Sequence, residues 1–308
     1  MSQPWSGEGL SQIDFMQKDE CILVDMNDNV IGNDNKYETH IFCPERPRGK
    51  LHRAFSVFLF NSEGKLLLQQ RAKEKITFPS VWTNTCCSHP LTGLEPSEVD
   101  GPEDVQSGTV MGVKRAAVRK LKHELGIDPQ QVPLENFKFL TRLHYWAADV
   151  VTHGPGAPWG EHEIDYILFI QVDQVDLNLN PEEVMDTKWV SHIELLQQMM
   201  PESGLMWSPW FRIIASKFMG PWWADLGKTI TTDAHFDPAT IHRFDCSEEH
   251  MGGAGEATEW LDKKGTEWGD RWLGHVAAEG KGKAVKTPPM KDFVVSDDKN
   301  IWRLEALE

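Results

Sequence analysis

Short apolar runs separated by turn residues mark the first part of the chain. They predict strands at residues 20–25, 54–60 and 65–71. The second and third runs are separated by only four residues, Asn-Ser-Glu-Gly, which predicts a β-hairpin with Gly64 in its turn. Residues 26–35 are rich in Asn, Asp and Gly and predict a turn.

Helical periodicity is clearest in residues 111–127, where Val113, Ala117, Leu121 and Leu125 share one face and Gly126 ends the helix. Strands are predicted at residues 137–147, 161–172 and 186–190, with a bulge or a strand start near Glu163. Two further helices are predicted. The first, at residues 192–200, begins with a capping box of Ser191 and Glu194. The second, at residues 210–218, begins after Ser208 and Pro209 and is ended by Gly220 and Pro221.

Strands and helices are thus mixed without regular alternation of strand and helix. This order predicts an α+β protein, or an α/β/α sandwich with a mixed sheet. After about residue 245 the chain becomes rich in Gly, Trp and charge and loses apolar periodicity. We therefore expect a main domain at residues 1–245 and an irregular C-terminal extension at residues 246–308.

Residues 72–110 predict a long loop, and a loop of this length within a domain is usually functional. It contains the sequence TNTCCSHP, in which Cys86 and Cys87 precede His89. Three interpretations are open for this segment: a metal site, half of a disulfide framework, or a reactive thiol held beside a metal. The disulfide is the weakest, because a bond between adjacent cysteines strains the peptide between them.

Composition narrows the function classes. The chain has 308 residues, 40% of them hydrophobic and 25% charged, as in ordinary soluble globular proteins. A net charge of -16 argues against a nucleic-acid surface, so an anionic ligand would need a local basic cluster. No apolar run is long enough to span a membrane. Five cysteines, an odd number, without a secretory signal favour reduced thiols.

The end of the helix at residues 111–127 resembles the second half of a Nudix box. Arg119, Leu121, Glu124, Gly126 and Ile127 match that motif. The motif's first Gly and three of its carboxylates are replaced, by Val105, Met111, Lys120 and His123. A Nudix-like fold is therefore indicated, whereas the carboxylates that a Nudix hydrolase uses to hold metals are mostly missing.

Four longer segments resemble type I isopentenyl-diphosphate isomerases, from about Cys21 to about Phe244. They read HRAFSVFLFN, LLLQQRAKEKITFPSVWTNTCCSHP, KRAAVRKLKHELGI and WGEHEIDYILF. The resemblance implies a Nudix-like α/β/α sandwich that interconverts isopentenyl and dimethylallyl diphosphate for isoprenoid biosynthesis. Such a reaction protonates an unactivated alkene to a tertiary carbocation and removes a proton from the opposite face.

The resemblance also implies roles for individual residues. Cys87 and Glu163 match the two acid/base partners, with Tyr145 beside Glu163 and Trp210 facing the carbocation. Cys86 has no such role. For the diphosphate, Arg71 and Lys75 match phosphate-binding residues, and Lys36 and Ser88 are expected at the same place. The ligands of a divalent transition metal (Zn, Mn or Fe) would be His40, His52, His89, Glu161 and Glu163.

Glu124 is expected to hold Mg²⁺ against the diphosphate. The expected partner is thus a small isoprenoid diphosphate, and neither a nucleic acid nor a membrane is expected. We expect a monomer, with a dimer as the alternative.

The N-terminal sequence taken as it stands predicts a cytoplasmic protein. A plastid location is the alternative if a transit peptide precedes this sequence. The alternative function is a Nudix pyrophosphohydrolase acting on a nucleoside diphosphate derivative. A non-catalytic binding protein on the same scaffold would not need both Cys87 and Glu163.

Overall fold

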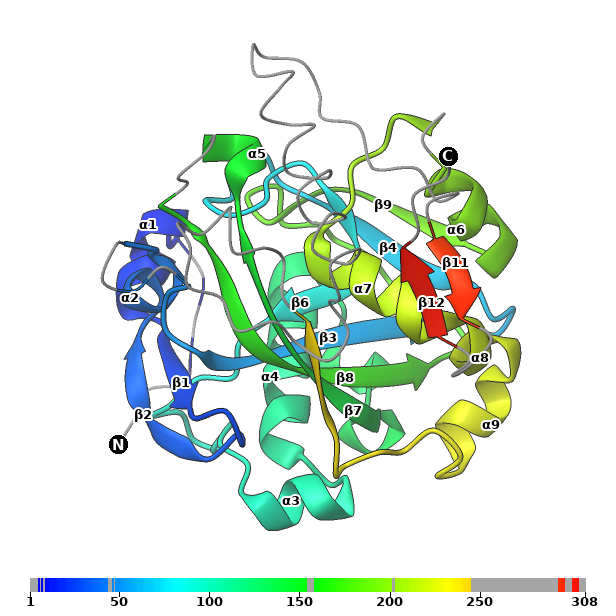
Figure 1. Cartoon of the computed structure of the whole chain (residues 1–308), viewed down its shortest axis with the longest axis horizontal. Coiled ribbons are helices and arrows are strands. Elements are labelled where there is room, and N and C mark those ends of the chain that lie inside the picture. Colours follow the sequence, from blue (N-terminus) through cyan, green and yellow to red (C-terminus); the bar gives the residue numbers. More distant parts are fainter. Residues whose placement is uncertain are drawn as a thin grey trace.

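The computed structural model describes residues 5, 7, 9–43, 46, 48–153, 158–200, 203–244, 293–296 and 301–304. Ten strands of this part of the chain form one mixed sheet, with the order β10-β7-β8-β3-β1-β2 along its main path (Figure 1). Strand β3 also pairs with β4 and β6, and β4 pairs with β5 and β9. The strands are β1 (Glu20–Val24), β2 (Val30–Asn35), β3 (His52–Phe60), β4 (Leu66–Arg71), β5 (Trp82–Thr83), β6 (Cys86–Ser88), β7 (Lys138–Ala148), β8 (Gly160–Gln171), β9 (Val184–Val190) and β10 (Ile241–Phe244).

Helices cover both faces of this sheet, which gives the α/β/α arrangement expected from the sequence (Figure 1). One apolar core lies between the sheet and helix α4, and a second, rich in aromatic residues, lies between the sheet and helices α6 to α9. The helices are α1 (Gln12–Lys18), α2 (Lys36–His40), α3 (Pro102–Ser107), α4 (Met111–Leu125), α5 (Val150–His153), α6 (His192–Gln198), α7 (Pro209–Lys217), α8 (Met219–Ala224) and α9 (Leu226–Thr231), with 3-10 turns at Pro129–Gln131 and Leu134–Asn136.

The strongest sequence patterns gave the right elements. Helix α4 buries the face carrying Val113, Ala117 and Leu121, and Gly126 ends it with a positive φ of 71°. Gly64 turns β3 into β4 with φ 72°. Helix α6 begins with the predicted capping box of Ser191 and Glu194.

Residues 72–110 are mostly loop, as predicted, with the short strands β5 and β6 and helix α3 within them. Other expectations were wrong. Residues 30–35 form strand β2 rather than a turn. Gly220 and Pro221 do not close α7, which ends at Lys217. They lie in the first turn of α8, where a proline needs no intrahelical N–H bond.

Of the two alternatives expected near Glu163, a bulge or a strand start, the bulge is absent, because Glu163 pairs regularly with both His52 and Tyr145. The strand start lies nearby, at Gly160. The register shift between β7 and β8 lies instead between Phe139 and Arg142. Because β8 is buried on both faces along nearly all its length, its sequence lacks the alternation that would have set its phase.

Most of the expected extension at 246–308 lies outside the described residues. Within it, strands β11 (Phe293–Ser296) and β12 (Ile301–Leu304) form a separate two-stranded antiparallel sheet. Cys246 is also outside the described part of the chain.

Candidate functional site

Strand pairing gathers the candidate residues at one end of the sheet. Glu163 on β8 lies directly between His52 on β3 and Tyr145 on β7. Neighbouring residues in register project to the same face of a sheet, so these three side chains converge. Glu161 is two residues before Glu163 and therefore shares that face.

Helix α2 adds two more residues from the N-terminal side. Asn35 caps it through a bond from the backbone N–H of Glu38 to the Asn35 side chain, 2.9 Å long. Lys36 and His40 are one helical turn apart and so project from the same side. The Nδ1 atom of His40 donates to the Lys36 carbonyl at 2.7 Å.

Three imidazoles and two carboxylates form a buried cluster of donor atoms. One donor atom from each residue lies within 4.8 Å of all the others. This spread fits a shared centre at metal–ligand distances of about 2.0–2.6 Å. The members are His40, His52, His89, Glu161 and Glu163.

Hydrogen bonds to backbone carbonyls set which nitrogen of His40 and His52 carries the proton, whereas Nε2 of His89 lies 2.7 Å from Oε1 of Glu163. Nδ1 of His52 donates to the Lys50 carbonyl at 2.8 Å, as Nδ1 of His40 does to Lys36. A carbonyl can only accept, so the Nε2 atom of each ring keeps its lone pair. Nε2 of both rings and Oε2 of Glu161 are buried and make no well-aligned hydrogen bond among the described residues, although Nε2 of His40 is only 2.8 Å from Oε2 of Glu161. Their positions suit ligation of a cation, because buried polar atoms without a hydrogen bond are rare in proteins.

Electrostatics favour the ligand forms of these groups. Burial lowers the pKa of His40 and lowers that of His89 well below its ordinary value, so both rings are neutral near pH 7. Burial works against ionisation of Glu161 and Glu163, but nearby groups outweigh it. His40 lowers the pKa of Glu161, and the contacts with His52 and Tyr145 lower that of Glu163.

The two adjacent cysteines point to opposite faces of strand β6. Cys86 is buried in the core under α4, with its Sγ 3.5 Å from Oε2 of Glu124. Cys87 lines the pocket, where Nη1 of Arg71 is 3.8 Å from its Sγ. Both are free thiols. Burial raises the pKa of Cys87 to about 12, although the Arg71 charge lowers it.

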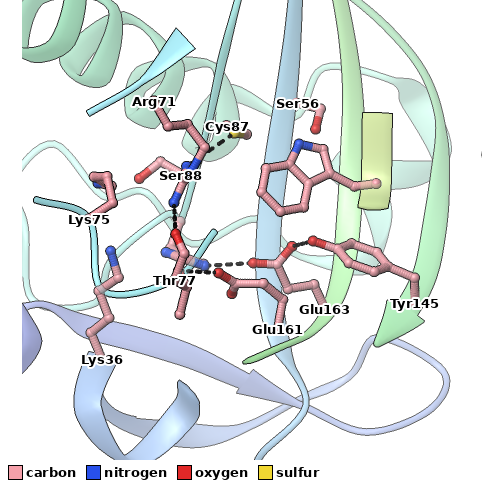
Figure 2. Close-up of a pocket in the computed structure, with 12 residues that line it drawn as sticks. Lys36, Ser56, Arg71, Lys75, Thr77, Cys87, Ser88, Tyr145, Glu161 and Glu163 are labelled. Carbon is pink, nitrogen blue, oxygen red and sulfur yellow. Dashed lines mark hydrogen bonds and ion pairs between the residues drawn. The ribbon is translucent and has the colours of Figure 1, made fainter. Parts of the chain in front are cut away.

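One pocket is lined by most of the residues predicted from the sequence (Figure 2). Figure 2 shows Lys36 and Lys75 on one side and Tyr145 on the other. The lining residues are Lys36, Ser56, Arg71, Lys75, Thr77, Cys87, Ser88, His89, Tyr145, Glu161, Glu163 and Trp210. His40 and His52 lie behind them in the donor cluster.

The cationic residues of the pocket are held by oxygen atoms of the chain. The Nε and Nη2 atoms of Arg71 donate to the carbonyls of Phe78 and Thr77, at 2.9 and 2.8 Å. Nζ of Lys75 is 2.6 Å from Oε2 of Glu183, a residue that we did not predict. Burial lowers the pKa of Lys75 to about 8, with Glu183 acting in the opposite direction.

Two aromatic residues complete the wall. The hydroxyl of Tyr145 donates to Oε2 of Glu163 at 2.5 Å. Trp210, from the first turn of α7, donates its indole N–H to Asn84 at 3.1 Å, and its ring is 5.7 Å from that of Phe78. The Arg71 guanidinium lies 5.5 Å from the Trp210 ring, so this face already contacts a cation.

Comparison with known proteins decides the family. The NUDIX domain model matches residues 50–211. An isopentenyl-diphosphate delta-isomerase of Aspergillus fumigatus is 50% identical over 73% of this chain and 78% of that protein. The Dictyostelium discoideum enzyme of the same name is 46% identical over 78% of this chain and 95% of that protein. The chain belongs to the isopentenyl-diphosphate delta-isomerases.

Membership of this isomerase family leaves the compartment open. One similar relative, from Arabidopsis thaliana, is named chloroplastic and is 46% identical over 74% of this chain and 75% of that protein. Among the described residues, no helix has the length and apolar character needed to cross a bilayer.

Glu124, like His40 and His52, is a predicted site residue that does not line the pocket. Its carboxylate is buried, 3.1 Å from Nζ of Lys120, and accepts from Gln69 at 3.2 Å. The Lys120 charge, and less strongly that of Lys75, lowers the pKa of Glu124 against the effect of burial. A single carboxylate near phosphate-binding cations is a common arrangement for Mg²⁺, which takes its other ligands from phosphate and water.

The residues that replace Nudix carboxylates have other partners in this isomerase. The ring of His123 contacts Trp5 and Phe15 from the N-terminal segment, with centroids 5.1 and 5.2 Å away. The ammonium group of Lys120 lies between Glu124 and Glu183, 3.1 and 4.0 Å from their oxygens. An internal cation thus stands between Glu124, the one carboxylate of α4, and Glu183 from the loop before β9.

Sequence reasoning missed four polar residues of this region. Thr77 and Ser56 line the pocket, and Glu183 and Lys120 form ion pairs beside it. Thr77 and Ser56 stood inside segments that carried the family resemblance. For Glu183 the sequence held no signal, because it comes from the loop before β9 and meets Lys75 only in the fold.

Proposed function

We propose that this chain interconverts isopentenyl diphosphate and dimethylallyl diphosphate through a tertiary carbocation. One observation carries the proposal: the Cys87 thiol and the Glu163–Tyr145 pair line the same buried pocket. Two proton-carrying groups in one pocket suit a reaction that adds a proton at one carbon and removes one at another.

The cationic end of the pocket would bind the diphosphate. Lys36, Arg71 and Lys75 provide the positive charge there, and Ser88 adds a hydroxyl. The planar guanidinium of Arg71 suits phosphate oxygens and is already fixed by two carbonyls. Such a clamp retains the allylic product, whose diphosphate is a leaving group.

The proton transfers follow from this placement. In the forward direction Glu163 protonates the terminal methylene and is left as a carboxylate that accepts the Tyr145 hydroxyl. Cys87 as thiolate removes the C2 proton, and the double bond moves without net gain of protons. Before the next turnover Glu163 regains one proton, relayed through the Tyr145 hydroxyl, and Cys87 loses one, so the cycle closes. In the substrate-free site Cys87 holds a proton and Glu163 is ionised, which is the arrangement that starts the reverse direction. Both arrangements belong to one reversible cycle.

The buried aromatic wall would protect the cation. Trp210 presents an indole face, an interaction worth about 2 kcal/mol with a desolvated cation. Phe78 and Trp210 exclude water, which would otherwise trap the carbocation as an alcohol.

Two metal sites complete the proposal. A divalent transition ion (Zn, Mn or Fe) bound by His40, His52, His89, Glu161 and Glu163 would orient Glu163 and tune its acidity. Glu124 would hold the Mg²⁺ that accompanies the diphosphate.

Residues 1–245 would form the complete catalytic unit, with 246–308 as an extension. Expected partners are small isoprenoid diphosphates, and a monomer is the expected state.

Detection of dimethylallyl diphosphate by NMR from labelled isopentenyl diphosphate, with Mg²⁺ present, tests the function. An assay for released orthophosphate or pyrophosphate, run on nucleoside diphosphate derivatives, tests the hydrolase alternative. Hydrolysis without isomerisation would refute the proposal.

A further inference from the structure

The loop that joins β4 to β5 has a strained turn beside the pocket. Phe78 and Ser80 have positive φ angles of 47° and 62°. Residues with a side chain adopt this region only when their surroundings hold them there. The loop therefore needs an anchor.

Asp149 supplies that anchor from the end of β7. Its side chain is fully buried, and its Oδ2 accepts the backbone N–H of Phe78 at 2.8 Å. Its Oδ1 accepts the backbone N–H of Thr152 at 3.0 Å, which starts helix α5. His153 is also close, with its Nε2 3.8 Å from Oδ2 and 3.1 Å from the Ile76 carbonyl.

The anchored turn contacts several parts of the site. The Thr77 hydroxyl donates to Oε1 of Glu161 at 2.8 Å, as Figure 2 shows. The carbonyls of Thr77 and Phe78 hold the Arg71 guanidinium, and the Phe78 ring packs on Trp210. A shift of this turn would move the anion clamp, a carboxylate of the donor cluster and the aromatic wall together.

We propose that Asp149 is a positioning residue, which sets the Thr77–Phe78 turn and thereby the direction of the Arg71 guanidinium and of Glu161. The inference rests on the proposed function for its catalytic consequence, but its effect on anion binding stands without it. Asp149 touches none of the reacting atoms and lies outside the pocket lining.

Replacement of Asp149 tests this role. In Asp149→Asn one oxygen remains, so one of the two N–H donors faces an amide NH₂ instead of an acceptor. We expect the KM for isopentenyl diphosphate and the Kd for inorganic pyrophosphate with Mg²⁺ to rise about tenfold or more, because small displacements of a binding group weaken binding strongly. The kcat should fall as well, because the same turn contacts Glu161 and Trp210, so the pyrophosphate Kd is the readout that isolates the anion clamp.

Asp100→Asn is the matched control. Asp100 is also buried and accepts two backbone N–H groups, from Gly112 and Val113, at 2.7 and 2.8 Å. Gly112 and Val113 lie at the opposite end of α4 from Glu124, and the distance along the helix axis from Gly112 to Glu124 is about 18 Å. This variant should lower the Tm comparably and leave KM and pyrophosphate affinity within about twofold of the wild type.

Three outcomes decide the matter. Unchanged pyrophosphate affinity in Asp149→Asn, or an equal loss in Asp100→Asn, overturns the positioning role. Weakened pyrophosphate binding in Asp149→Asn alone supports it, even if the wild type fails to isomerise isopentenyl diphosphate, a failure that would refute only the proposed function. If Asp149→Asn does not fold, Asp149→Ser keeps a good helix cap with a single oxygen and is expected to show the same weakening.

Discussion

Lys75 should set the alkaline limit of this enzyme. Its pKa is lowered to about 8 mainly by burial, and the charges of Lys36, Arg71 and Lys120 lower it further, while Glu183 opposes them. Because the pKa is lowered, the ammonium group is charged below about pH 8 and neutral above it. The charged fraction falls from about nine-tenths at pH 7 to about one-tenth at pH 9.

The diphosphate needs that charge. A charge-assisted hydrogen bond of this kind contributes about 1.5–3 kcal/mol, so enzyme with neutral Lys75 should bind substrate about ten- to a hundredfold more weakly. We therefore expect kcat/KM to fall about five- to tenfold between pH 7 and pH 9, because kcat/KM follows ionisations of the free enzyme.

The assay is a pH profile of isopentenyl diphosphate isomerisation for the wild type and Lys75→Arg. Arginine stays charged throughout this range, so its profile should remain level to about pH 9, even if its absolute rate is lower. Should Lys75→Arg keep the same decline centred near pH 8, another group causes it and the reasoning is refuted.

Other substitutions test the remaining roles. Cys87→Ala should abolish turnover with fold and metal content nearly unchanged, and residual activity near the wild-type level would contradict the role of the thiol. Cys86→Ala should retain activity and lose about 1 kcal/mol of unfolding free energy, measured by urea denaturation, because it removes a buried Sγ and its contact with Glu124. Glu163→Gln should remove activity and weaken metal binding, as elemental analysis after dialysis would show. Deletion of residues 246–308 should leave measurable catalysis, and an inactive but folded truncation would show that the extension contributes to the site.

The sequence predicted correctly those elements whose own residues favour the conformation that they adopt in the folded chain. Helix α4 has one apolar face and a glycine at its end, and α6 has a complete capping box, so both are visible without tertiary information. Strand β2 is not, because its exposed Val30 and Ile31 and its Asn and Asp residues resemble a turn until β1 pairs with it. Helix α8 begins with Gly and Pro, which locally indicate an end rather than a beginning.

For the candidate site, motif resemblance found the residues that would perform chemistry, but not those that hold them. Cys87 and every member of the donor cluster except His40 stand in the segments that carried the resemblance, and the structure brings them together. Asp149 and Glu183 act through a backbone N–H and an ammonium group of distant segments. Only the folded chain reveals such partners, since the sequence does not show which loops meet.

The donor cluster also has a consequence for the order of events during synthesis. Its three imidazoles lie within the first 89 residues, whereas both carboxylates come from β8, at positions 161 and 163. A nascent chain that has emerged only as far as β7 offers the three imidazoles and neither carboxylate. Stable capture of a divalent ion by all five donors must therefore await translation of β8, so metal loading would report that this strand has docked beside β3.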